Sequence, residues 1–191
     1  MAVTTCEKLI RMNIAEDCSA PMVKGWEKIG YIMNKSDIAS FTRSGNTVSA
    51  ISLNSGAAAY EIYNTGNNPF SGTTTALNVA DIRNTFDKTA GFMVLDDGNK
   101  VTEDIIDQLA NGSFVVILEQ TFTNGGSGEN KFEIIGLECG AKATEINKDR
   151  TSDDTRGGYQ VVLTESQAPT SGLFFFDSDI ATSRAALNAL L

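Results

Sequence analysis

The sequence predicts a mainly β (α+β) domain: an antiparallel β-sandwich or barrel with one flanking amphipathic helix and a short C-terminal helix. Three observations favour this fold. Short strand-like runs recur along the chain and are separated by glycine- and asparagine-rich turns. The best interior helical periodicity falls at residues 101–112. The strongest strand run, 114–118, is apolar at every position, so it should be covered on both faces.

The length and composition indicate one domain. The chain has 191 residues, enough for a single core, and we predict one β domain over residues 1–191. Residues 1–28 are predicted to form an irregular arm and residues 177–191 the C-terminal helix. No apolar run approaches the roughly 18 residues that a membrane helix needs. A charged head followed by an apolar segment is missing at the N-terminus, so we expect no signal peptide and maturation in the cytosol.

Residues 29–63 are predicted to form a meander of short antiparallel strands. The strands are expected at 29–32, 47–53 and 59–63, with turns between them. Residues 64–75 are polar and glycine-rich, and we predict a long loop that is functional or interfacial. One or two further strands are expected within 76–95, of which 91–95 is the clearest. Trp26, the only tryptophan, is predicted to anchor packing in the core or against a neighbouring chain.

The helix at 101–112 is predicted from its cap and its stripe. Thr102 can cap its N-terminus, and Gly112 can end it. Val101, Ile105 and Leu109 recur at a spacing of four, with Ile106 beside them, and should pack on a sheet.

A β-hairpin around residues 113–139 is the centre of the predicted fold. Its second strand alternates through Phe132 and Ile134 and then changes phase beside Gly136, which predicts a β-bulge. The segment GGSG at 125–128 joins two strands, so we interpret it as a hairpin turn and not as a phosphate-binding loop.

The rest of the chain is predicted as a loop, two strand runs and a helix. Residues 141–158 are expected to form a polar loop, followed by a strand with Tyr159, Val161 and Leu163 on one face. The apolar run 173–176 fits either a core strand or a subunit interface. Asp177 or Asp179 can cap the last helix, whose apolar stripe would contain Ile180, Leu187, Leu190 and Leu191.

Motifs for catalysis or for cofactor binding do not stand out. The chain has no histidine, so the commonest general base is missing. Neither a GxGxxG nor a Walker A pattern occurs. Asp149, Asp153 and Asp154 could suggest a calcium loop, but the glycine and glutamate of the EF-hand pattern are missing, and we predict a solvated loop. We therefore predict a protein that is not an enzyme, with no catalytic, cofactor-binding or metal-binding residues.

The cysteines indicate the redox compartment, and the net charge indicates which binding partners are favoured. Cys6, Cys18 and Cys139 form an odd set without CxxC spacing, which favours free, buried or half-buried thiols in a reducing compartment; a Cys6–Cys18 disulfide stays open. The net charge is −9, from 15 basic and 24 acidic residues. The closest approach to a basic cluster is Lys148 with Arg150, which argues against tight binding of nucleic acid.

Six segments carry a resemblance: CEKLIRMN (6–13), GYIMNKSDIA (30–39), TVSAISLNSGAAAYEIYN (47–64), FVVILEQ (114–120), FEIIGLECG (132–140) and GGYQVVLTESQAP (157–169). Their order and spacing resemble virion structural proteins, of the tail-tube or tail-ring kind, from phages that infect Bacteroidota, including crAss-like phages. The resemblance has no diagnostic motif and maps no functional residue onto this chain.

The resemblance implies a fold of the tail-tube type and a homo-oligomeric ring, or stacked rings, in the tail of the virion. Strands of neighbouring subunits would line a channel through which DNA passes without specific binding, and a negative lumen would let the polyanion slide. Other tail or neck proteins would be partners, no membrane would be involved, and assembly would take place in the host cytoplasm.

Two other classes of protein stay open. One is another virion or surface assembly component, such as a capsid-decorating or pilus-like β-sandwich. The other is a carbohydrate- or ligand-binding module. The second fits less well, because the expected loops 64–75 and 141–158 contain only Phe70 as a large aromatic residue.

Overall fold

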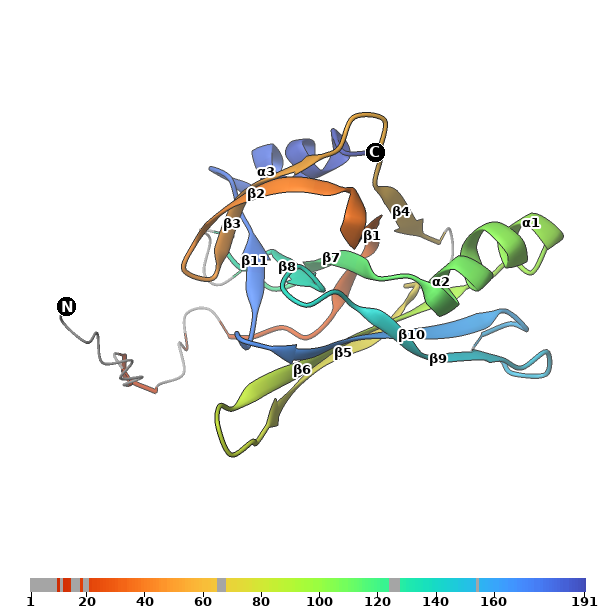
Figure 1. Cartoon of the computed structure of the whole chain (residues 1–191), viewed down its shortest axis with the longest axis horizontal. Helices are drawn as coiled ribbons and strands as arrows, with labels where there is room; N and C mark the ends of the chain where they lie inside the picture. The colour runs from red at the N-terminus through yellow and green to blue at the C-terminus, as the bar shows by residue number, and fades with distance from the viewer. Residues whose placement is uncertain are drawn as a thin grey trace.

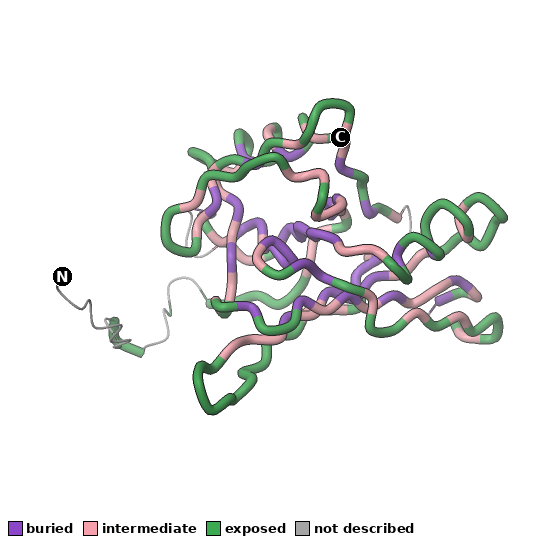
Figure 2. The backbone as a smooth tube through the Cα atoms, in the orientation of Figure 1, coloured by how far each residue is buried: buried purple, intermediate pink, exposed green. Residues whose placement is uncertain are grey.

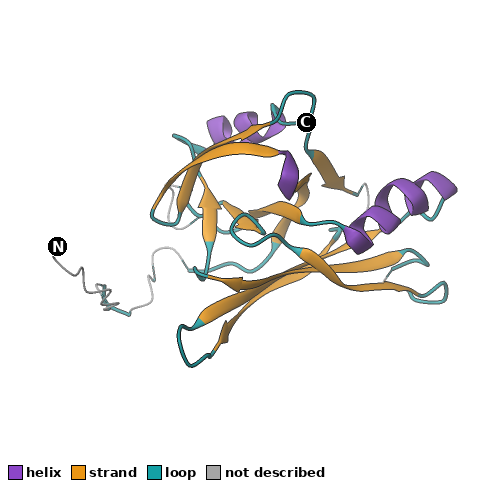
Figure 3. Cartoon of the chain, viewed as in Figure 1, coloured by secondary structure: helices purple, strands orange, loops and turns teal. Residues whose placement is uncertain are grey.

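The chain folds into two β-sheets that pack on each other (Figure 1, Figure 3). A computed structural model describes residues 10, 12–14, 18, 21–64, 68–123, 128–153 and 155–191. The seven-stranded sheet contains, in spatial order, β2 (Ile38–Ser44), β3 (Thr47–Leu53), β11 (Leu173–Phe175), β8 (Phe132–Ile135), β7 (Phe114–Gln120), β1 (Trp26–Asn34) and β4 (Tyr60–Tyr63). The four-stranded sheet contains β5 (Phe70–Asn78), β6 (Thr85–Val94), β10 (Tyr159–Ala168) and β9 (Lys142–Lys148). The mainly β class that the sequence predicts is confirmed.

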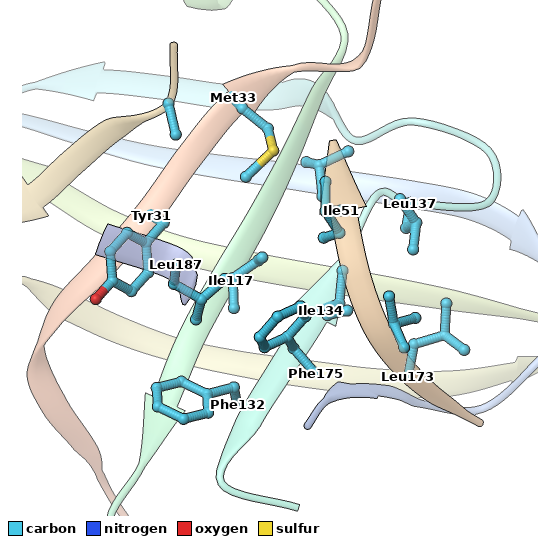
Figure 4. Close-up of a cluster of buried hydrophobic side chains, with 13 residues drawn as sticks. Tyr31, Met33, Ile51, Ile117, Phe132, Ile134, Leu137, Leu173, Phe175 and Leu187 are labelled. Carbon is cyan, nitrogen blue, oxygen red and sulfur yellow. The ribbon is translucent and has the colours of Figure 1, made fainter. Parts of the chain in front are cut away.

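Strand β7 lies between two hydrophobic cores, as its apolar sequence predicts. Val115 and Ile117 belong to the first core, which the seven-stranded sheet forms with the C-terminal helix. Figure 4 shows Ile117 among the side chains of this core. Phe114, Val116 and Leu118 belong to the second core, which lies between the two sheets. All five side chains are buried, and the purple of β7 in Figure 2 shows this. Alternate residues of a strand face opposite sides, so a strand between two cores must be apolar throughout.

The predicted meander over residues 29–63 is wrong in its pairing. β2 and β3 do pair with each other, and the expected strand 47–53 has the observed bounds. β1, however, pairs with β4 and β7, not with β2. A short 3₁₀ helix, η1 (Lys35–Asp37), separates β1 from β2, and β3 continues the sheet through a parallel pairing with β11.

Two predicted loops contain edge strands. β5 occupies much of the expected loop 64–75, and β9 begins the expected loop 141–158. Both are outer strands of the four-stranded sheet, and most of their side chains are exposed or half-buried. Such strands need no apolar alternation, and their polar sequences therefore suggest loops. The predicted N-terminal arm is also shorter than residues 1–28, because β1 begins at Trp26, which packs against the second core.

The predicted β-bulge at Gly136 is a turn. β8 ends at Ile135, and the chain turns through 136–139 before it enters β9 in the other sheet. Gly136 has a φ of +96°, and Gly140 N donates to Gly136 O at 2.9 Å. The phase change in the sequence therefore marks the point where the chain crosses between sheets. The β7–β8 hairpin itself is confirmed, whereas residues 125–127 of the proposed GGSG turn lie outside the described residues.

The interior helix begins earlier than the sequence predicts and contains a π turn. It consists of α1 (Asn99–Val101), the π-helical segment η2 (Thr102–Ile106) and α2 (Asp107–Asn111). Gly98 is the N-cap, so Thr102 is not. A π turn adds a residue, and Ile106 therefore takes the inward position that regular spacing gives to Ile105.

The burial of Ile105 and Ile106 agrees with the register that the π turn produces, and substitutions at the two positions test this register. Ile106 is 6% exposed and Ile105 42%. We expect Ile106→Ala to lower the free energy of unfolding by about 2–4 kcal/mol, through lost burial and a cavity. Ile105→Ala should change it by about 0.5 kcal/mol or less. Chemical denaturation of both variants measures the difference, and equal losses would contradict the π-shifted register.

The C-terminal helix α3 (Ile180–Asn188) covers the first core. Asp179, one of the two predicted caps, accepts a hydrogen bond from Thr182 N at 2.8 Å. Leu187 is fully buried in the first core. Leu191, which the sequence predicts in the apolar stripe, is 49% exposed and lies beyond the last residue of the helix, Asn188. Arg184 donates two hydrogen bonds to the Glu119 carboxylate on β7, which holds the helix in place.

Residues Leu173–Phe175 of the apolar run 173–176 form β11, which belongs to the first core. Leu173 and Phe175 are at most 1% exposed, and Figure 4 shows both among the core side chains. The core interpretation of this run therefore applies to these two residues.

Candidate functional site

The outer face of the four-stranded sheet is polar and carries few charges. On β6, Lys88, Ala90 and Phe92 are buried toward the other sheet, so the residues between them face outward. Pairing then places hydroxyls side by side: Thr74 and Thr89 Oγ1 atoms lie 2.7 Å apart, and those of Thr144 and Thr164 2.8 Å apart. By the same register, the charged residues of this face are Asp87, Lys142 and Glu145.

Both edges of this sheet are open in the described chain. β5 and β9 each pair with one neighbour only, β6 and β10 respectively. The nine residues of β5 include no charged residue and no proline. Natural proteins protect long edge strands with charges, prolines or covering segments, because unpaired backbone groups template pairing with another chain. β9 is less bare, since it carries Lys142, Glu145 and Lys148. The β5 edge is therefore a candidate surface for pairing.

The β5–β6 hairpin extends beyond the rest of its sheet (Figure 1). β9 begins at Lys142, which lies level with Thr74 through the pairs Lys142–Thr164, Thr164–Thr89 and Thr89–Thr74. Residues 75–84 thus project past the first residue of β9. Three apolar side chains lie there in the open: Leu77 is 55% exposed, Val79 75% and Ile82 fully. The sequence predicts a loop for part of β5; the β-branched run Thr73–Thr75 was the available signal for a strand.

An ion cluster between the sheets is structural. Lys88 Nζ lies 2.9 Å from Glu165 Oε2 on the paired strand, and both side chains are fully buried. Glu165 also accepts hydrogen bonds from the backbone N–H groups of Gly136, Glu138 and Cys139, at 2.8–2.9 Å. Glu165 on β10 therefore fixes the turn that follows β8, and both of its carboxylate oxygens accept hydrogen bonds from that turn.

The pKa of Glu165 reflects these contacts. Burial alone would raise the pKa of the carboxyl group, but the backbone donors Cys139 and Gly136 and the Lys88 ammonium bring it below its ordinary value. Glu138 extends the cluster to the surface, because it binds Arg43 Nη1 at 2.6 Å. A group held ionised by fixed donors stabilises the fold and is poorly suited to proton transfer.

The predicted solvated loop and the basic pair, Lys148 with Arg150, contain residues that make local contacts. Asp149 accepts hydrogen bonds from the backbone and the hydroxyl of Thr151, which lower its pKa. Asp153 is exposed, and Asp154 lies outside the described residues. Lys148 and Arg150 both bind Asp97 Oδ2, each at 2.8 Å, so this pair is not a bare cationic patch.

The described residues include two of the three cysteines, Cys18 and Cys139, and many carboxylates. Within those ranges, no group of three Cys, Asp or Glu side chains is placed to hold a metal ion. Cys18 and Cys139 are free thiols, and both are exposed, which corrects the prediction of buried or half-buried thiols. Cys6 lies outside the described residues. None of the described helices has both the length and the apolar character needed to cross a membrane.

Comparison with protein-family models, with curated proteins and with solved structures found no match to this chain.

Proposed function

We propose that this chain is a structural subunit of a phage tail tube or tail ring, which assembles with copies of itself around a pore that conducts DNA during ejection. One observation carries the proposal: among the described residues, no strand pairs with either outer edge of the four-stranded sheet, and one of these edges is a nine-residue strand without charge. A protein that works as a monomer gains nothing from such an edge, whereas a self-assembling protein can pair it.

The strand directions suit head-to-tail pairing. Each neighbouring pair in the sheet, β5–β6, β6–β10 and β10–β9, is antiparallel, so β5 and β9 run in opposite directions. The β9 edge of one copy can therefore pair with the β5 edge of the next and continue the same antiparallel pattern. A head-to-tail contact of this kind gives a ring when the rotation between copies closes. Ring closure would satisfy the edge backbone groups of the four-stranded sheet in every copy.

The face left for the lumen suits a DNA channel. In such a ring, the sheet packs its inner face on the subunit body, and the polar outer face would line the pore. Hydroxyl and amide groups dominate this face, with Lys142 as its basic residue against Asp87 and Glu145. DNA binding depends mainly on contacts between basic side chains and phosphates. A lumen with few cations, on a chain of net charge −9, would let DNA pass without specific binding. Other tail or neck proteins of the virion would bind the ends of the ring.

A proline substitution at the β5 edge tests the proposed pairing between β5 of one copy and β9 of the next. Successive backbone N–H groups of an edge strand point alternately toward and away from the partner strand. Thr74 N faces β6, since it lies 3.2 Å from Thr89 Oγ1, and the N–H of Thr73 therefore points to the open side. Thr73→Pro removes that edge donor and leaves the β5–β6 hydrogen bonds in place.

We expect purified wild-type protein to form rings with a central pore in negative-stain images, and Thr73→Pro to remain as single subunits. Thr73→Val is the matched control, because it keeps the N–H and the β-branched shape, and it should assemble. Circular dichroism checks that each variant is folded. A wild-type particle that stays monomeric at every concentration would sink the proposal. Assemblies without a pore would favour a capsid-decorating or pilus-like component.

A further inference from the structure

The segment before β1 has a strand-like sequence whose apolar side chains are not covered. Ile10, Met12 and Ile14 alternate with Arg11 and Asn13, so an extended chain would place the three apolar side chains on one face. These three side chains are 81–92% exposed. Such alternation is typical of a strand that has one covered face and one solvated face. We call residues 10–14 the arm strand.

The segment that carries the arm strand joins the fold beside the first residues of β5. The side chain of Asn68 donates a hydrogen bond to the backbone oxygen of Trp26, where β1 begins. Asn68 Oδ1 also accepts a hydrogen bond from Phe70 N at 2.9 Å, where β5 begins. The ring of Phe70 in turn packs against Gly30 of β1. A chain that continues from Trp26 toward the N-terminus therefore starts next to one end of the β5 edge.

We infer that the arm strand pairs with the β5 edge of its own chain before assembly, and that β9 of the next copy displaces it when a ring forms. The inference rests on the proposed function, because it assigns a protecting segment to the same β5 edge. An uncharged edge strand needs such a cover while the chain is a single subunit. The structure shows the undocked state, since Ile10, Met12 and Ile14 are exposed.

Length and direction allow this pairing. An extended chain from Ile14 to Trp26 reaches roughly 40 Å, whereas the nine residues of β5 span about 30 Å. Followed back from Trp26, the chain would run along β5 from Phe70 toward Asn78, so the arm strand would be antiparallel to β5. Antiparallel pairing is also what joins every pair of neighbouring strands in this sheet.

The two faces of the arm strand match those of β5. Thr74 faces outward beside Thr89, so Thr75 and Leu77 take the inner face of the sheet. Both of these inner-face residues are exposed, because no strand lies beside them on the open side. An arm strand that turns its three apolar side chains inward would bury Leu77 and leave its polar side chains on the polar outer face.

Intramolecular cross-linking tests the docked state. With the three native cysteines replaced by serine, Met12→Cys is combined with Thr75→Cys on the inner face of β5. After mild oxidation of dilute protein, we expect a disulfide within one chain, measured by mass spectrometry as thiols protected from alkylation. The matched control combines Met12→Cys with Asn147→Cys, at an exposed position on the β9 edge.

The Thr75 pair should close severalfold faster than the Asn147 pair, at a rate that does not depend on protein concentration. Equal rates would mean that the arm strand has no preference for the β5 edge, and would overturn the inference. A rate that rises with protein concentration would place the arm strand on another copy, which would overturn it as well.

Assembly kinetics supply the second readout. Met12→Asp should weaken the cover and raise the initial rate of ring formation, followed by light scattering, severalfold above that of the wild type. Asn13→Asp adds the same charge to the outer face of the arm strand and should assemble at the wild-type rate. Slower assembly of Met12→Asp would show that the arm strand promotes ring formation, which is the opposite of the inferred role.

The inference and the proposed function fail in different ways. A wild-type protein that never forms rings, but closes the Thr75 disulfide faster than the Asn147 disulfide, would refute the ring and keep the arm strand as a cover of the β5 edge. Rings together with equal closure rates would keep the pairing between β5 and β9 and remove the role of the arm strand.

Discussion

Replacing Glu165 by alanine is expected to lower the free energy of unfolding at neutral pH by about 3–5 kcal/mol. The substitution leaves the fully buried Lys88 ammonium without its nearest carboxylate, since Glu138 Oε2 is farther away at 3.8 Å. It also removes the acceptor of three backbone N–H groups in the turn 136–139. Both losses fall between the two sheets, where water cannot readily replace the missing partner.

The effect should depend on pH, with a sign that the pKa shift fixes. The folded-state pKa of Glu165 lies below its ordinary value, to which it returns in the unfolded chain, about 4.3 for glutamate. The stabilisation by ionised Glu165 is therefore fully present above that value and is lost as pH falls through the folded pKa. The gap between wild type and Glu165→Ala should shrink as the solution is acidified below about pH 4.

Two controls separate the buried charge from the lost hydrogen bonds. The double variant Lys88→Met with Glu165→Gln removes both charges and keeps an acceptor oxygen, so it should recover much of the stability that Glu165→Ala loses. Glu145→Ala removes an exposed carboxylate from β9 and should change stability by about 0.5 kcal/mol or less. Urea denaturation between pH 3 and 7 measures all three. A Glu165→Ala protein within about 1 kcal/mol of wild type would contradict the structural role of the cluster.

Part of the ion cluster around Glu165 can be predicted from the sequence. Glu165 continues the inward series of Val161 and Leu163, and Lys88 stands two residues before the inward Ala90. Each strand thus shows a charge at a core position, which is a recognisable anomaly. Which two strands pair is not encoded locally, however, because β6 and β10 are far apart in the chain. The ion pair could therefore be seen only in the structure.

Central strands and edge strands differ in how well the sequence predicts them. The sequence predicts β7, because a strand between two cores must be apolar on both faces, whatever its neighbours are. The sequence predicts loops for β9 and for residues 70–75 of β5, because an edge strand needs little burial and its polar sequence is that of a loop. β5 and β9 are also the two edge strands that form the candidate pairing surfaces. The proposed site therefore lies where local sequence patterns carry the least information.

Gly136→Ala is the second substitution expected to have a large effect. The residue has a φ of +96°, in the region that glycine adopts at little cost and alanine does not. A Cβ atom there would lie 2.2 Å from Phe114 O and 2.9 Å from Ala141 N. Both are backbone atoms. Phe114 belongs to β7, and the backbones of Phe114 and Ala141 are joined by two hydrogen bonds. Neither can move without disturbing the central strand, so we expect a loss of about 3 kcal/mol or more.

Gly45→Ala isolates the cost of the backbone conformation alone. Gly45 also has a positive φ, +62°, but a Cβ atom there meets nothing within 4 Å. Its substitution should cost about 1–2 kcal/mol, the ordinary penalty for a left-handed alanine. The difference between the two variants in denaturant midpoint then measures the steric contact at Gly136. Equal losses would mean that the turn can yield, and that the crossing from β8 to β9 is less rigidly tied to β7 than its hydrogen bonds indicate.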